Sequence, residues 1–173
     1  MAKLARDVMT PDPACCTAST SVDEVAKLMV QNDCGEMAGR TVEIVRDLGM
    51  EEDTIVSSFD HVMLAEVRRL APRIATGVLT SDRLYRVREY LEALDADAYH
   101  PADHVDRATV KELTGAGLLV NVWTINTRPR MRALIDAGVT GIFTDYPNRL
   151  AEVASEAGRC VTLRPRLRRR RSG

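Results

Sequence analysis

The stretch LLVNVWTIN, residues 118–126, has the pattern of a buried strand that ends in a polar loop. Apolar residues stand at both alternating sets of positions up to Trp123, as in strands of parallel sheets that are covered by helices. The polar run Thr124–Asn126 then marks the end of the strand. Trp123 is the only tryptophan of the chain. Its position fits either a core residue or the edge of a binding site, and the pattern alone leaves both open.

Similar apolar segments, among them TIVSSF and ATGVL, recur along residues 41–158. We expect strands to start near Ile55, Ile74, Asp97, Leu119 and Gly141. These starts lie 19–23 residues apart with amphipathic patterns between them, which is the rhythm of repeated β/α units. The fold class is therefore α/β with a parallel sheet. Periodicity fits an open doubly wound sheet as well as part of a (β/α)8 barrel, whose complete form needs about 250 residues.

Turn residues support the same division into units. Gly117 and Gly138 each follow an alanine shortly before an expected strand, a position that suits a left-handed helix cap. Asp106 precedes a helical pattern and is a predicted N-cap. Met63 and Val67, four residues apart, begin the apolar face of another predicted helix.

Composition indicates a globular protein that works in the cytoplasm. The 173 residues are 45% hydrophobic and 28% charged, enough for one ordinary domain with its own core. No apolar run approaches the roughly 20 residues of a membrane span, and the first residues lack the apolar core of a signal peptide. The four cysteines have no metal-ligand spacing, so we expect reduced thiols.

Positive charge is concentrated near the C-terminus, where residues 164–171 read RPRLRRRR. We expect residues 159–173 to form a disordered, solvated tail. Binding of this tail to nucleic acid is disfavoured, because no aromatic residue stands between the arginines and the rest of the chain is acidic.

The segment RDVMTPDPACCTASTSVDEVAKLMVQNDCGEM, residues 6–37, differs from the rest in its rhythm. It resembles the first half of a cystathionine-β-synthase-type (CBS) domain, with a turn, a short strand and a helix, and the resemblance covers residues 4–37. In that family a second half completes an adenosine-nucleotide site, and nothing after Met37 resembles it. The resemblance implies a nucleotide-binding regulatory module as an alternative function.

From about residue 41 to residue 153 the chain resembles another family, the glycerophosphodiester phosphodiesterases. Five motifs carry the resemblance, in the family's order: VSSFDHVMLAEVRRLAP at 56–72, TGVL at 76–79, YHP at 99–101, GLLVNVWTIN at 117–126 and GVTGIFTDYP at 138–147. The resemblance implies the last five β/α units of a TIM barrel rather than a doubly wound sheet. The expected domains are a partial CBS-like segment at 1–38, a partial barrel at 39–158 and the tail at 159–173.

The resemblance also implies an activity. The family hydrolyses glycerophosphodiesters with a divalent metal, Ca²⁺ or Mg²⁺, and two histidines. Its H-R-G, E-x-D, E-x-K and H-D motifs belong to the part of the family that precedes the matching stretch. We therefore expect a truncated phosphodiesterase-family protein that is inactive alone, with no catalytic or metal-binding residue assigned. The second alternative is a fusion remnant without a function.

Four residues are carried over as the substrate-binding side of the site. The resemblance places Phe59, with Ser58 beside it, at the mouth of the barrel after the VSSF strand. Trp123 would provide an apolar surface for the glycerol carbons, and Asn126 follows in the same loop. Sites of TIM barrels are built at these C-terminal strand ends.

The sequence offers two weaker candidates for catalytic or metal-binding chemistry. Ser57 and Ser58 are weak candidates for a nucleophile, because the sequence places no histidine to activate them. A metal pair of His100 and His104 is disfavoured, because their spacing suits a helix and Pro101 argues against one.

Three aspartates follow expected strands, namely Asp60, Asp82 and Asp145. Carboxylates at one barrel mouth could hold a hard cation. Capping of the next helix is the simpler explanation, and it is our prediction for Asp145.

The expected partners follow from the barrel. A glycerophosphodiester-type small molecule would bind once the barrel is complete. The open sheet edges at either end of a five-strand segment would allow a homodimer.

Overall fold

The computed structural model describes residues 37–159, which form an α/β unit around one five-stranded parallel sheet. The strands are β1 (Ile55–Ser58), β2 (Ala75–Thr80), β3 (Ala98–Pro101), β4 (Leu119–Val122) and β5 (Gly141–Ile142). The helices are α2 (His61–Leu70), α3 (Val87–Ala93), α4 (Arg107–Gly115), α5 (Arg128–Ala137) and α6 (Pro147–Glu156). All five strands begin at or within one residue of their predicted starts.

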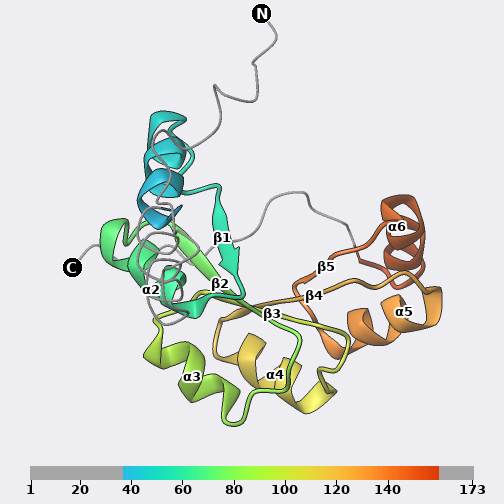
Figure 1. Cartoon of the computed structure of the whole chain (residues 1–173). Coiled ribbons are helices and arrows are strands. Elements are labelled where there is room, and N and C mark those ends of the chain that lie inside the picture. The colour runs from blue at the N-terminus through green and yellow to red at the C-terminus, as the bar shows by residue number, and fades with distance from the viewer. Residues whose placement is uncertain (1–36, 160–173) are drawn as a thin grey trace, which may run out of the picture.

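The order of the strands decides between the two architectures. It is β1-β2-β3-β4-β5, so each strand lies beside the next one in the chain. A doubly wound sheet reverses its strand order once, whereas successive right-handed crossovers in one direction keep every helix on one face. Figure 1 shows α2 to α6 following one another in an arc around the strands. The structure is therefore that of a partial TIM barrel, as expected.

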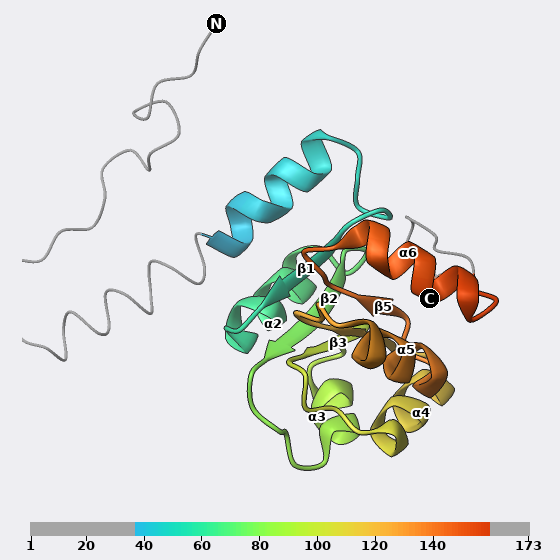
Figure 2. The same ribbon diagram turned by 90° about the vertical axis from the view of Figure 1, so that its right-hand side faces the viewer.

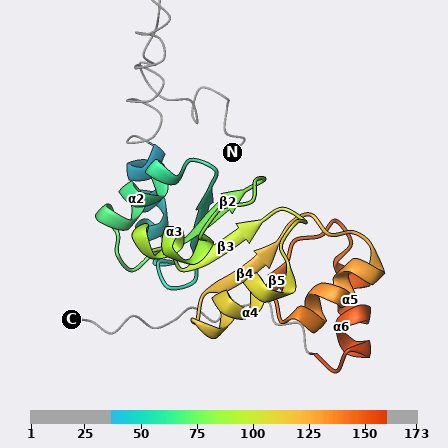
Figure 3. The same ribbon diagram turned by 90° about the horizontal axis from the view of Figure 1, so that it is seen from below.

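The hydrophobic core lies between the strands and the helices. The outward residues of the strands, such as Val78 and Val120, are fully buried there against helix residues such as Leu64, Leu113 and Leu134. Figure 3 shows the same layering from below. The opposite face of the sheet is not covered by these helices, and we call it the inner face.

A helix over residues 37–47 precedes β1. Its residues Ala38, Val42 and Val45 are buried in the same core, and Arg46 donates a hydrogen bond to the Leu70 carbonyl at 2.8 Å. Figure 2 shows this helix in blue beside the β1–α2 unit. Residues 1–36 of the expected CBS-like segment and the arginine-rich run 164–171 lie outside the described residues.

The predicted turn chemistry is confirmed. Gly117 and Gly138 have φ values of 82° and 94°, in the left-handed region where a Cβ atom is unfavourable. Asp106 caps α4, because its carboxylate accepts a hydrogen bond from the Thr109 backbone N–H at 2.9 Å. Within residues 37–159, the structure contains no helix that is both long and apolar enough to cross a membrane.

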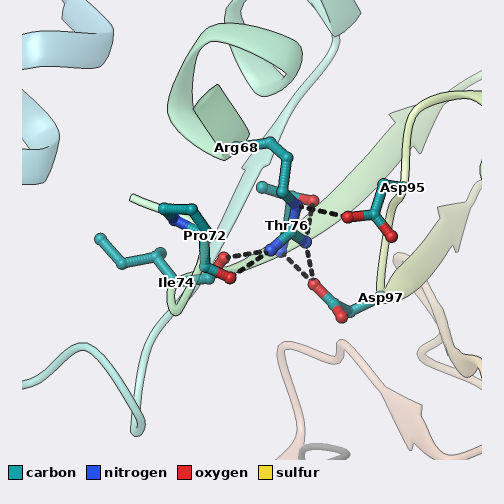
Figure 4. Close-up of polar contacts among 6 residues, drawn as sticks. All are labelled: Arg68, Pro72, Ile74, Thr76, Asp95 and Asp97. Carbon is teal, nitrogen blue, oxygen red and sulfur yellow. Dashed lines mark hydrogen bonds and ion pairs between the residues drawn. The ribbon is translucent and has the colours of Figure 1, made fainter. Parts of the chain in front are cut away.

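One buried ion pair joins α2 to the starts of two strands (Figure 4). The Arg68 guanidinium donates to the carbonyls of Pro72 and Ile74 at 2.8 and 3.1 Å, and to the Thr76 hydroxyl at 3.0 Å. It also pairs with the Asp97 carboxylate, which in turn accepts from the Thr76 backbone N–H. The side chains of Arg68 and Asp97 are only 11% and 15% exposed. This ion pair fixes α2 to the N-terminal ends of β2 and β3, away from the C-terminal strand ends.

We predict that Arg68→Ala lowers the free energy of unfolding by about 3 kcal/mol, because it leaves the Asp97 carboxylate buried without its cation. The neighbouring Arg69 is the control, since it pairs with Glu66 in an exposed i,i+3 arrangement. Arg69→Ala should cost no more than about 0.5 kcal/mol. Urea denaturation of the two variants measures the difference, and equal losses would contradict a special role for Arg68.

Candidate functional site

Two aromatic side chains meet on the inner face at the C-terminal ends of distant strands. Phe59 directly follows β1 and Trp123 directly follows β4. Their ring centroids are 5.7 Å apart with an interplanar angle of 88°, an edge-to-face contact. Phe59 is nevertheless 59% exposed. This pair forms an apolar surface at the strand ends where TIM barrels build their sites.

Trp123 is held in place through its single polar atom. The indole Nε1–H donates to the His100 carbonyl at 2.7 Å, and the Trp123 backbone N–H donates to the Pro101 carbonyl at 3.1 Å. The Trp123–Thr124 peptide bond is cis. Because its N–H is satisfied within the protein, the indole presents carbon atoms to its surroundings, and its partial exposure distinguishes it from a core residue.

His100 lies next to this surface and connects three strands. It is only 2% exposed, its Nδ1 lies 2.7 Å from the Ser57 Oγ, and the Asn121 Nδ2 donates to its Nε2 at 2.9 Å. The Phe143 ring makes an edge-to-face contact with the His100 ring, with the ring centroids 5.4 Å apart. Sequence reasoning missed this cluster, because it did not foresee that His100 would lie beside Ser57. The signal available was Asn121, a polar residue within an otherwise apolar strand.

The protonation of His100 determines what the cluster can do. Burial lowers the pKa of His100 from its ordinary 6.5 to about 4, so the imidazole is neutral at pH 7. Since Nε2 accepts from Asn121, the proton resides on Nδ1 and is donated to the Ser57 Oγ. In this arrangement histidine is not a base toward the serine. Ser57 is therefore oriented by His100 without being activated as a nucleophile.

Two glycines make room for these side chains. A Cβ atom at Gly77 would lie 2.8 Å from the His100 Cε1, and one at Gly141 would lie 2.6 Å from the Asn121 Oδ1. Glycine within a strand commonly marks such a close approach. The ring of His100 and the amide of Asn121 thus occupy space that any other residue at these positions would fill.

Ser58 and Asn126 have contacts within the protein. The Ser58 Oγ accepts from the Asp60 backbone N–H at 3.0 Å in a local turn. The Asn126 Oδ1 accepts from the Thr144 hydroxyl at 3.1 Å and from the Asp145 backbone N–H at 3.0 Å, while its Nδ2 donates to the Asp145 carboxylate at 2.7 Å. Asn126 therefore joins the loops that follow β4 and β5. Their contact with substrate stays a prediction.

The prediction that Asp145 caps the last helix is wrong. The N-cap of α6 is Tyr146, which makes no side-chain capping bond, and Asp145 instead accepts the amide of Asn126. The physical reason is competition for the carboxylate by an amide from the neighbouring loop. Asp60, by contrast, does cap α2 by accepting from the backbone N–H groups of Val62 and Met63.

The metal implied by the family resemblance does not fit the described residues on their own. Residues 37–159 contain no group of three or more His, Cys, Asp or Glu side chains that could hold a metal ion. Both ring nitrogens of His100 are engaged by Ser57 and Asn121, so a metal pair with His104 is not formed. We therefore assign no step to a metal bound by this part of the chain.

Comparisons with known proteins identify the family. The model of the Glycerophosphoryl diester phosphodiesterase family matches residues 20–149. The chain therefore belongs to this family. The match begins within the segment that resembles a CBS domain.

Individual relatives agree with the family match. Protein YqiK of Bacillus subtilis is 36% identical over 116 residues, which are 65% of this chain and 48% of that protein. A glycerophosphodiester phosphodiesterase of Bacillus altitudinis is 32% identical over 117 residues, 66% of this chain and 48% of the relative. The chain thus spans about half the length of the curated relatives it matches.

A solved structure shows the same fold. An Oleispira antarctica phosphodiesterase, determined in complex with its product sn-glycerol 3-phosphate, is 26% identical with a TM-score of 0.66. The similarity covers 72% of this chain and 51% of that one. The parallel sheet of residues 37–159 therefore resembles part of a barrel of this family.

We predict that Gly77→Ala lowers the free energy of unfolding by about 2 kcal/mol, because the new methyl group displaces the His100 ring from a packed position. Gly115→Ala is the control, since a Cβ atom there meets nothing within 4 Å. The control should be neutral or stabilising by about 0.5 kcal/mol, because alanine is the better helix residue. Thermal and urea unfolding measure both variants, and equal effects would contradict the close packing.

We predict a pH dependence of stability that belongs to His100. Its pKa is about 4 in the folded chain and 6.5 ordinarily, so between these values only the unfolded chain takes up a proton. The contribution to stability is complete above about pH 6.5 and is lost as the pH falls toward 4, reaching about 3 kcal/mol. The difference between wild type and His100→Gln across pH 7 to 4 measures it. Parallel pH profiles would contradict a neutral, buried His100.

Proposed function

We propose that residues 37–159 provide the substrate-binding side of a glycerophosphodiester phosphodiesterase site. The observation that carries this proposal is the edge-to-face pair of Phe59 and Trp123 at the C-terminal ends of β1 and β4. A broad apolar surface suits the carbon atoms of a glycerol unit, and burial of aromatic area is a large contribution to binding. The Oleispira relative was solved with sn-glycerol 3-phosphate, which supports this choice of ligand.

The carried-over residues have different roles in this proposal. Phe59 and Trp123 contact the glycerol carbons. Asn126 holds the loops after β4 and β5 together through Thr144 and Asp145. It thereby positions these loops beside the ligand. Ser58 shapes the turn between Phe59 and α2 by accepting from Asp60. A position beside the phosphate for either polar residue depends on the completed barrel.

Hydrolysis needs an acid, a base or nucleophile, and neutralisation of charge on the phosphoryl oxygens. A divalent metal, Ca²⁺ or Mg²⁺ in the family, would supply the last of these. We propose that residues 37–159 do not supply these groups, and that β/α units from another polypeptide segment must meet the inner face for turnover. Without that completion we expect the chain to bind the alcohol portion of a substrate but not to hydrolyse it efficiently.

A second copy of the chain is one candidate for that completion. In the described part of the chain, β1 and β5 are the two ends of the sheet and each pairs with one neighbour. Such edges can pair with further strands. Association of two copies stays a prediction, as does a cytoplasmic location. The CBS-type nucleotide-binding alternative depends on residues 4–37, and no observation on residues 38–159 favours it.

A hybrid enzyme tests the proposed function. Residues 37–159 replace the matching part of the Bacillus altitudinis phosphodiesterase, and the rest of that protein is retained. We expect the hybrid to hydrolyse a glycerophosphodiester with Ca²⁺ or Mg²⁺. Trp123→Ala in the hybrid should lower kcat/KM about 30-fold, because the loss of a large aromatic contact costs about 2 kcal/mol.

The matched control is Leu48→Ala, which removes an exposed apolar side chain outside the sheet. It should leave kcat/KM of the hybrid unchanged. An active hybrid that is indifferent to Trp123→Ala would contradict the proposed substrate surface. Turnover by the full chain alone at the rate of the hybrid would contradict the proposed need for completion.

A further inference from the structure

The cluster of Ser57, His100 and Asn121 has no role in the function proposed so far, yet it lies on the same face as the aromatic pair. Ser57 stands two residues before Phe59, and Asn121 stands two residues before Trp123, so each polar residue shares a face with the aromatic residue after it. Positions two apart on a strand are about 6.6 Å apart. The polar cluster is therefore one layer deeper than the aromatic surface.

We propose that Ser57 and Asn121, oriented by His100 between them, form a subsite for the hydroxyl groups of the alcohol portion of the ligand. This inference rests on the proposed function, since it takes Phe59 and Trp123 to contact the carbons of the same ligand portion. It assigns recognition of hydroxyl groups to residues that neither the resemblance nor the aromatic pair points to.

Counting hydrogen-bonding groups supports this assignment. The His100 ring uses both nitrogens, accepting from the Asn121 amide and donating to the Ser57 Oγ. Ser57 then retains its own O–H for donation, and Asn121 retains its Oδ1 for acceptance, with no further partner for either within residues 37–159. Ser57 is exposed and Asn121 is half-buried, so both can be reached from the inner face. A hydroxyl group, which both donates and accepts, matches this pair.

The neutrality of the cluster favours hydroxyl groups over phosphate. Its three members carry no charge at pH 7, because burial lowers the pKa of His100 to about 4. A phosphate placed here would lose hydration without gaining a cation, which is unfavourable. Polarisation along the chain from Asn121 through His100 to Ser57 strengthens the final O–H donor.

The test compares two ligands that differ only in hydroxyl groups, sn-glycerol 3-phosphate and n-propyl phosphate. The full chain is titrated with each, and the fluorescence of Trp123, the only tryptophan, reports binding. We expect wild type to bind glycerol phosphate about tenfold more tightly, as two neutral hydrogen bonds would provide. Ser57→Ala removes one of the two bonds and leaves that of Asn121, so it should reduce this preference to about threefold while the affinity for propyl phosphate is unchanged.

Ser57→Thr keeps the hydroxyl and should restore the preference, whereas the control Ser155→Ala on the exposed side of α6 should not alter it. Circular dichroism shows whether each variant is folded. If Ser57→Ala is not folded, Ser57→Thr still tests the subsite, because a folded threonine variant without the preference would contradict it. An undiminished preference in Ser57→Ala, or no preference in wild type while both ligands bind, overturns the subsite. If neither ligand perturbs Trp123, the proposed aromatic surface fails, and the subsite fails with it.

Discussion

His100 joins three strands of the sheet, among them β1, which does not pair with β3. Its imidazole bridges Ser57 on β1 and Asn121 on β4, while its carbonyl oxygen accepts the indole N–H of Trp123. A ring of this size can lie across the inner face only because Gly77 has no side chain. His100 therefore contributes to three features of the inner face: the approach of β1 to β4, the position of Trp123 and the absence of charge. Removing water from the imidazole keeps it uncharged, and an uncharged imidazole can both accept and donate within one face.

The architecture separates stability from recognition. The outward residues of the strands pack against the helices, and the Arg68–Asp97 ion pair secures α2 at the starts of β2 and β3. The residues proposed to meet a ligand stand on the other face and near the other strand ends. This division is general among TIM barrels, where the C-terminal ends of strands carry function and the opposite ends carry stability. It allows the inner face to hold exposed aromatic and polar groups without weakening the core.

Much of the fold followed from local chemistry. Strand starts, the glycine caps at Gly117 and Gly138, and the Asp106 cap could be predicted because each depends on residues within a few positions. The choice of a barrel over a doubly wound sheet needed the family resemblance, since both architectures share one periodicity. The position of Phe59 and Trp123 directly after their strands followed from the strand pattern, whereas the partners of Ser57 and Asp145 did not. Those contacts join residues that are 43 and 19 positions apart in the chain, and the three-dimensional arrangement of the strands and their loops determines which side chains meet.

The inner-face residues that touch one another, Ser57, Phe59, His100, Asn121, Trp123 and Phe143, are all uncharged at neutral pH. Attraction between such groups and a ligand depends on contact area and hydrogen bonds rather than on long-range fields. Salt screens fields between charges and leaves short-range contacts almost unchanged. The binding energy that this face supplies is therefore nearly independent of ionic strength. Discrimination between phosphodiesters by their charge must come from the β/α units that complete the barrel opposite this face.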